Sequence, residues 1–405
     1  MADIFAAYAV ENDEKNVRST HECESERLHL YTSVRTEKQR LVVSGLDRHI
    51  PDLCAPATYL SVKHKQDTTV LRLIAVDFTE WLSQSASNIK DTDKTWSSRV
   101  FRPIYYLYVA CFLSLTKWWP YGTNVYDHDW DALIILDACR VDALREVSEE
   151  YDFVSVDETI NSVGSTSFEW MNHTFDTDYR EEIERTAYVS GNGYTDRVLG
   201  HGGETGHAAM PFGPSEYDVV DPEDFAYLEE LWRAEFDNSS EWMIDGNAGS
   251  WVHPKYTTDR AIEAGRERSS DRLLVHYMYP HDPFPLADSD DLVRPFDSLR
   301  SRDVTRAEAY REYLDHLRLV LDEVERLLEN LNAEDVVITA DHGEAFGEYG
   351  FYRHVIGCPL PCMREVPWVK TTAEDTGMYD PEAPEPESET DSVDVESRLE
   401  NLGYL

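Results

Sequence analysis

Basic side chains are scarce in this sequence. The chain of 405 residues has 37 Lys and Arg against 79 Asp and Glu, a formal net charge of −42. A surface this acidic repels nucleic-acid phosphates, so the composition excludes a general DNA- or RNA-binding protein. The same composition favours a protein kept soluble in concentrated salt, where screening weakens self-repulsion. We therefore expect a halophilic host, with an ordinary acidic protein as the alternative.

Cysteine is infrequent as well. The six cysteines are scattered without the spacing of a disulfide framework, and the CPLPC pair, Cys358 and Cys362, is too isolated to indicate a zinc site. A basic start followed by an apolar run marks a signal peptide, and MADIFAAYAVENDEK lacks both. These features predict a reducing, cytoplasmic compartment.

No apolar run reaches the roughly 20 residues that span a bilayer. The longest, PIYYLYVACFLSLTKWWPYG, occupies residues 103–122, and its apolar part falls short of that length. Length therefore favours a buried core helix. Lys117, Trp118 and Trp119 at its end resemble an interfacial anchor, so contact with a membrane surface through residues 104–119 is the alternative.

Charge is distributed unevenly along the chain. Residues 1–100 are nearly balanced, and the remainder carries almost all of the net negative charge. This break predicts a separate amino-terminal module over 1–100, whose role no motif indicates. We expect an apolar helix or interfacial segment over 101–122, a catalytic domain over 123–372, and an acidic linker with a short terminal helix over 373–405.

The pattern after Trp130 is typical of an α/β fold. DALIILD and DVVITAD are continuous apolar runs that end at Asp137 and Asp341, as central parallel strands do, and DRLLVHYMY (271–279) is another. Apolar residues at intervals of three and four over 305–331 predict a long amphipathic helix that leads into the last strand. The order predicts an α/β/α sandwich with a mostly parallel central sheet.

Groups that bind metals or anions follow all three predicted strands. Asp137 ends the first strand, His281 follows the second, and Asp341 and His342 follow the third. Ligands of open α/β sheets bind beyond the carboxyl ends of the strands. Asp137, Asp341 and His342 form a mixed oxygen and nitrogen set that suits a divalent cation, which would polarise an anionic ester and activate a nucleophile.

These motifs resemble those of the alkaline-phosphatase superfamily, in its sulfatase-like branch. LDACRVD resembles the strand in which an Asp binds metal and an Arg follows. ITADHGEAFGEYG resembles the Asp-His-Gly strand end, and YPHDPF is similar to the Pro-His-x-Pro segment. The resemblance covers roughly residues 121–368. It implies a metal-dependent hydrolase or transferase that acts on phosphate or sulfate esters.

The resemblance also implies a hydroxyl nucleophile between the first two motifs. NSVGSTSFEWMNHTF has glycine, three hydroxyls and then a helical run, and a helix N-terminus receives anions. The family places its nucleophile two residues before a Pro, which indicates Thr166 with Phe168 in the Pro position. Thr166 would also contact the metal. Because Phe168 departs from the pattern, Ser165 and Ser167 remain candidates.

Three further side chains belong to the predicted site. His281 and His354 would contact the ester oxygens or hold a second metal. Arg140 would orient Asp137 or bind the substrate anion, and a structural ion pair is its alternative. We leave His276 out, because its offset of five residues from His281 places the two on opposite faces of a regular strand.

Phosphoester chemistry is favoured over sulfate hydrolysis. Formylglycine sulfatases carry Cys or Ser followed by x-Pro-x-Arg, and STSFEW has neither the Pro nor the Arg. A true sulfatase and a catalytically silent binding protein are the alternatives. The cation could be Mn, Zn, Ca or Mg, and the substrate an envelope glycan or lipid. The sequence does not distinguish hydrolase from transferase.

Overall fold

The computed structural model describes most of the chain from residue 96 onward. The described residues are 83, 96–200, 210–214, 216–234, 236–237, 240–246, 249–267 and 270–386. They fall into two compact units. The first contains helix α4 (Trp96–Thr116) up to Leu107 together with residues 210–212, and the second contains the remaining described residues from Tyr108 onward. The functional residues all belong to the second unit.

Seven strands of this unit form one sheet in the order β2-β11-β8-β1-β7-β3-β4. β1 pairs in parallel with β7 and β8, and β3 pairs in parallel with β7 and β4. Only β11 runs against its neighbours β8 and β2 within this sheet. In chain order the strands are β1 (Ala132–Leu136), β2 (Glu158–Asn161), β3 (Thr186–Ser190), β4 (Tyr227–Glu230), β7 (Arg272–Tyr277), β8 (Ala333–Thr339) and β11 (Glu365–Ala373).

Strand β1 shows why both faces of the sheet are covered. Every residue of ALIIL is buried; Ile134 and Leu136 belong to one apolar cluster, while Leu133 and Ile135 belong to the other. Successive side chains of a strand point to opposite faces, so an unbroken apolar run requires a layer on each side. The predicted α/β/α sandwich with a mostly parallel sheet is therefore confirmed.

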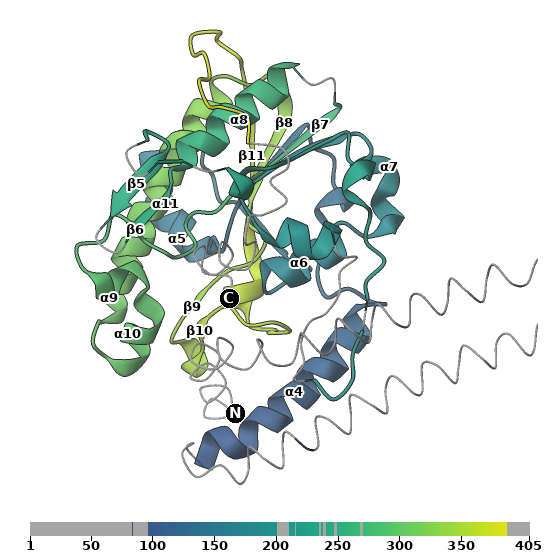
Figure 1. Ribbon diagram of the computed structural model, residues 1–405, viewed down its shortest axis with the longest axis vertical. Helices are drawn as coiled ribbons and strands as arrows, with labels where there is room; N and C mark the ends of the chain where they lie inside the picture. Colours follow the sequence, from purple (N-terminus) through teal and green to yellow (C-terminus); the bar gives the residue numbers. More distant parts are fainter. Residues whose placement is uncertain are drawn as a thin grey trace, which may run out of the picture. The chain divides into compact units, whose positions relative to one another are not determined.

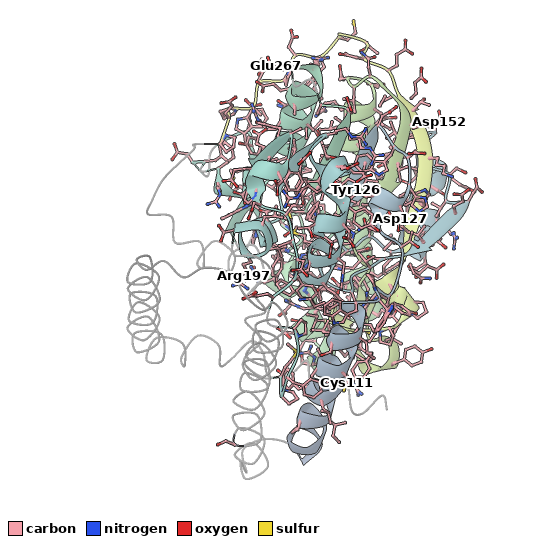
Figure 2. All side chains as sticks on the ribbon, turned by 90° about the vertical axis from the view of Figure 1, so that its right-hand side faces the viewer. Cys111, Tyr126, Asp127, Asp152, Arg197 and Glu267 are labelled. Carbon is pink, nitrogen blue, oxygen red and sulfur yellow. The ribbon has the colours of Figure 1, made fainter. Side chains whose placement is uncertain are left out.

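The two layers consist of helices from different parts of the chain. One face carries α5 (Val141–Val147), α8 (Pro254–Glu267) and α11 (Arg306–Leu328), and the other carries α6 (Ser167–Thr174) and α7 (Arg180–Ile183) (Figure 1). Figure 2, in which Tyr126 of the second cluster is labelled, shows how closely side chains fill the molecule around it.

Helix α11 confirms the helix predicted over 305–331. Thr305 caps its first turn by accepting a hydrogen bond from the Glu308 amide, and the Glu308 side chain accepts one from the Thr305 amide. This reciprocal capping box begins the helix at Arg306. The helix then leads through a short turn into β8, which ends just before Asp341.

Helix α4 confirms that the apolar segment after residue 103 is helical. No helix among the described residues is long and apolar enough to cross a bilayer. Val109 and Leu113 are buried, and the Tyr108 hydroxyl donates to the Gly357 carbonyl oxygen at 2.9 Å. Trp118 and Trp119, just beyond the helix, are 68% and 73% exposed. The segment therefore combines a packed face with an exposed aromatic end.

The acidic segment after β11 differs from the predicted linker. Helix α8 binds its backbone: the Tyr256 hydroxyl donates to the Pro384 carbonyl oxygen, Arg260 to that of Ala383, and Arg266 to that of Tyr379. These cationic and hydroxyl donors hold residues 379–384 of the predicted acidic linker against the helix. The predicted terminal helix lies outside the described residues.

The remaining elements are short. They are β5 (Met243–Gly246), β6 (Gly249–Val252), α9 (Asp290–Val293), α10 (Pro295–Ser301), β9 (Ala345–Phe346), β10 (Tyr352–Arg353) and α12 (Pro361–Arg364). The cysteines of the described part, at 111, 139, 358 and 362, are free thiols. Nearly all of the predicted module over 1–100 lies outside the described residues, so that boundary remains a prediction.

Candidate active site

Four parallel strands deliver polar side chains to one edge of the sheet. Asp137 follows β1, His276 lies near the end of β7, Asn192 follows β3, and Asp341 and His342 follow β8. Parallel neighbours present their carboxyl ends at the same edge, which brings together residues far apart in sequence. A hydrogen bond joins the carboxyl ends of β1 and β8, because the Ala138 backbone amide donates to Asp341 Oδ1 at 3.1 Å.

Asp137, Asp341 and His276 form a compact buried cluster. Each offers one ligand atom, and these atoms all lie within 4.8 Å of one another. His276 Nε2 is 3.5 Å from Asp137 Oδ2 and 3.9 Å from Asp341 Oδ2. Among the described residues, Asp137 Oδ1, Asp341 Oδ2 and His276 Nε2 have no hydrogen-bond partner although they are buried. Buried charged oxygens without partners are costly, and a bound cation relieves that cost.

His342 completes this cluster. Its Nε2 lies 3.4 Å from Asp341 Oδ2 and 3.7 Å from Asp137 Oδ1. Its Nδ1 lies 2.9 Å from the Gly343 carbonyl oxygen, which can only accept, so Nδ1 carries a proton and Nε2 faces the carboxylates. A backbone carbonyl commonly orients a metal-binding histidine in this way.

Electrostatics within the cluster reflect its excess of carboxylates. Burial lowers the pKa of His342, but the charges of Asp341 and Asp137 raise it above its ordinary value overall. Burial raises the pKa of Asp137, and the facing imidazoles of His276, His281 and His342 outweigh it and hold that pKa well below the usual range. The carboxylates thus attract positive charge, which protons or a metal ion can supply.

The position of His276 contradicts the expectation from strand alternation. Its ring belongs to the cluster, and Nδ1 lies 3.1 Å from the Tyr188 hydroxyl on the neighbouring strand β3. β7 ends at Tyr277, so His281 lies in the following loop and not on the strand. The parity rule therefore does not connect the two histidines, and the structure places His276 beside Asp137 and Asp341, where the sequence analysis did not.

A second group lies beside the first. His281, Glu344 and His354 offer ligand atoms within 4.8 Å of one another, and the rings of His342 and His354 are 4.4 Å apart. His354 Nδ1 is 3.3 Å from Glu344 Oε2. Burial raises the pKa of Glu344 to about 8, and burial together with the charges of His342 and His281 lowers that of His354 well below its ordinary value.

The three hydroxyls at the start of α6 have different surroundings. Thr166 is the N-cap, and its Oγ1 accepts a hydrogen bond from the Glu169 amide at 3.2 Å. Ser165 Oγ lies 2.9 Å from Glu169 Oε2 and accepts from the Cys358 amide at 3.0 Å. Ser167 Oγ instead points toward Asp137 and His342, 3.4 Å from Asp137 Oδ2 and 3.3 Å from His342 Nε2.

Arg140 lies in ion pairs. Its Nε and one terminal nitrogen donate to the two oxygens of Asp142 at 2.8 and 2.6 Å, and the other terminal nitrogen donates to Glu348 and to the Glu344 carbonyl oxygen. All three nitrogens of this buried guanidinium have protein acceptors. The arrangement matches the structural ion pair that was the alternative for this residue, so Arg140 takes no part in the chemistry proposed below.

Sequence reasoning missed Asn192 and Tyr188. Asn192 Nδ2 donates to Asp137 Oδ2 at 2.8 Å, and the Tyr188 hydroxyl holds the His276 ring. Both come from TAYVSGN, an apolar strand followed by a small polar turn, which is the pattern that identified the other strand ends. Glu344, two residues after His342 in ADHGE, was not assigned to the site either.

Comparison with known proteins gives only remote similarities. No family model matches the sequence, and no curated protein matches it. Among solved structures, the soluble domain of lipooligosaccharide phosphoethanolamine transferase A from Neisseria meningitidis is 15% identical, with a TM-score of 0.36 over 58% of this chain and 75% of that one. The integral membrane form of that transferase matches at 13% identity and a TM-score of 0.39, over 82% of this chain and 66% of the other.

A phosphonate monoester hydrolase from Silicibacter pomeroyi also matches, at 13% identity and a TM-score of 0.29 over 59% of this chain and 67% of that one. At these values the similarity is remote. What can be said about activity therefore depends on the motifs and on the geometry of the site.

Proposed function

We propose that this chain is a metal-dependent hydrolase or transferase of phosphate esters, with sulfate esters as the alternative substrates. The observation that carries the proposal is the buried cluster of Asp137, Asp341, His276 and His342 with a serine hydroxyl directed into it. Such a set combines a cation site, an anion-binding edge and a nucleophile at one point.

The residues fit a divalent cation. Two carboxylate oxygens and one imidazole nitrogen are buried without partners, and mixed oxygen and nitrogen donors suit Zn or Mn, with Mg or Ca as harder alternatives. Asp137, Asp341, His342 and His276 would hold the ion. When bound, it would supply charge neutralisation for the ester and would lower the pKa of a neighbouring hydroxyl.

Ser167 is the nucleophile that the geometry favours over Thr166. Ser167 Oγ approaches both Asp137 and His342, while Thr166 Oγ1 accepts a hydrogen bond from its own helix. The hydrogen bond from the Glu169 amide holds the Thr166 hydroxyl in place as the N-cap of α6. Ser167 Oγ would lose its proton and form the bond to phosphorus as the bond to the ester's leaving oxygen breaks, and that oxygen would take up a proton and depart as the alcohol. Water or a second alcohol would then attack phosphorus and lose a proton, and Ser167 Oγ would leave phosphorus and regain one.

The second group of residues would bind the transferring group. His281 and His354 lie beside His342, so they are placed to donate hydrogen bonds to the ester oxygens as negative charge develops there. The His281, Glu344 and His354 set could hold a second cation instead. Water as acceptor makes the protein a hydrolase, and an alcohol makes it a transferase.

Alanine variants of the two adjacent hydroxyls test the proposal. Protein in molar salt would be assayed with a phosphodiester and a sulfate ester, and quenched reactions would be examined by intact-protein mass spectrometry. Ser167→Ala should abolish both turnover and the covalent adduct while retaining metal by elemental analysis, since four ligands remain. Thr166→Ala should stay active and lose about 1 kcal/mol of stability as a missing cap.

Other outcomes are equally informative. A dead Thr166→Ala with an active Ser167→Ala would return the nucleophile to the residue that the family pattern indicates. Normal turnover by both variants would refute the covalent route and leave a water nucleophile. Metal-loaded protein that is inert toward every ester would support a silent binding protein.

We also propose that the exposed aromatic end of α4 contacts a membrane surface. Trp118 and Trp119 are largely exposed, and Lys117 beside them is suited to lipid headgroups. An envelope lipid or glycan would then be the substrate. Loss of vesicle co-sedimentation in a Trp118→Ser, Trp119→Ser variant would support this, and binding unchanged from that of the unmodified protein would refute it. Cytoplasmic placement remains a prediction.

A further inference from the structure

A cavity of about 380 Å³ lies beside the proposed active site. Most of its lining is apolar, including Leu231, Trp232, Phe236, Met243, Trp251 and Met278. Its volume falls within the range of about 300–1,000 Å³ that is usual for small-molecule sites, and such sites are mainly apolar with a few polar groups. Four segments distant in sequence build it, which Figure 1 shows in part as the β5–β6 hairpin on the side of the sheet that carries α8 and α11.

The cavity and the active site share residues. His281 and Asp282 line the cavity, and His281 also belongs to the group with Glu344 and His354. Gly191 also lines the cavity and directly precedes Asn192, which donates to Asp137. A group bound in the cavity therefore lies next to an ester positioned at the cluster.

Four side chains of the lining are polar, His253, Thr257, His281 and Asp282, and the last two lie at the end shared with the active site. Asp282 is 2% exposed, with Arg353 at 3.5 Å from its Oδ2. The carboxylate is thus already balanced by a cation, so the rest of the cavity suits an uncharged, apolar occupant.

We propose that this cavity binds an apolar group of the ester substrate, of roughly hexyl or phenyl size. The inference rests on the proposed function, because it assigns the cavity to the same substrate whose phosphoryl group reaches Ser167. Burying an alkyl chain here removes it from water while the phosphorus stays at the cluster, and each methylene should raise affinity about two- to fourfold.

Binding and turnover would be measured separately. Methyl-, hexyl- and phenylphosphonate would be titrated against the full chain in molar salt by tryptophan fluorescence, which Trp232 and Trp251 in the lining should report. We expect hexyl- or phenylphosphonate to bind at least about tenfold more tightly than methylphosphonate. Tighter binding of hexylphosphonate would indicate that the cavity accepts a flexible alkyl chain, and tighter binding of phenylphosphonate that it accepts a flat ring. Equal affinity for all three, or no binding of any, would overturn the inference.

Three variants test whether the apolar group of the phosphonate binds in the cavity. Ala234→Phe fills the cavity and should remove the preference for the larger phosphonates, leaving methylphosphonate binding unchanged. Met243→Ala removes an apolar side chain from the cavity wall and should weaken the affinity for hexylphosphonate several-fold. Met378→Ala, at a residue that is 88% exposed, is the matched control and should match the unmodified protein. A preference that survives Ala234→Phe in protein with unchanged thermal unfolding would place the apolar group elsewhere.

The two proposals can fail separately. Turnover of methyl and hexyl phosphodiesters at the same kcat/KM would refute the apolar subsite and leave the esterase chemistry intact. Tight hexylphosphonate binding without turnover of any ester would refute the chemistry and leave the cavity as a ligand site.

Discussion

Arg364 and Glu169 form a buried ion pair that joins helix α12 to the first turn of α6. Arg364 donates to Glu169 Oε1 at 2.6 Å, and the two side chains are 1% and 0% exposed. Its other nitrogens donate to the carbonyl oxygens of Cys358 and Val163. Glu169 Oε2 accepts from the Ser165 amide at 3.1 Å, so this pair positions the segment that carries Ser167.

Replacing Arg364 with Met should strongly destabilise the protein. Breaking a buried pair leaves an uncompensated charge and costs about 3–5 kcal/mol, a large part of the total stability of about 5–15 kcal/mol of a typical domain. Burial raises the pKa of Glu169, but the charge of Arg364, together with the charge of His173 and hydrogen bonds from Arg364 and the Gly357 amide, holds that pKa below its ordinary value overall. The pair therefore stabilises above the pKa of unfolded Glu, and this contribution is lost as pH falls through the folded pKa.

Urea unfolding in molar salt measures this effect. Lys370→Met is the matched control, because Lys370 and Glu158 form an ion pair at 2.8 Å with both side chains about 60% exposed, and exposed pairs contribute about 0–1 kcal/mol. The deficit of Arg364→Met should shrink at acid pH, where Glu169 is protonated. A loss below about 1 kcal/mol at neutral pH, no larger than that of the control, would refute the reasoning.

Three further outcomes are expected. Asn192→Ala removes the 2.8 Å hydrogen bond to Asp137 and should weaken metal affinity about 10- to 100-fold by equilibrium dialysis, and unchanged affinity would remove Asn192 from the site. Gly164→Ala would place a methyl group 2.3 Å from the Trp170 amide nitrogen, so urea unfolding should show a loss of about 1–3 kcal/mol, and full stability would contradict this packing. A chain beginning at Trp96 should fold in molar salt and keep esterase activity; metal-loaded but inactive protein would assign residues 1–95 a role in the site.

The α/β architecture and the strand ends can be predicted from local sequence patterns. The run ALIIL before Asp137 and the periodic helix α11 are local signals, because side-chain period reflects which faces of a strand or helix are buried. Polar residues that follow such runs must lie at the carboxyl edge of a parallel sheet. For that reason the sequence alone is enough to group Asp137, Asp341 and His342.

Tertiary structure alone decided how the remaining side chains are used. Ser167 and Thr166 are adjacent hydroxyls at one helix start, and only the position of α6 relative to β1 and β8 directs Ser167 toward Asp137 and His342. His276 lies in the cluster because β7 pairs with β1. The guanidinium of Arg140 is occupied by Asp142 and Glu348, so it is not directed at a substrate. A side chain's role depends on the neighbours that packing supplies, and apart from Asp142 the neighbours named here lie tens to hundreds of residues away in the chain.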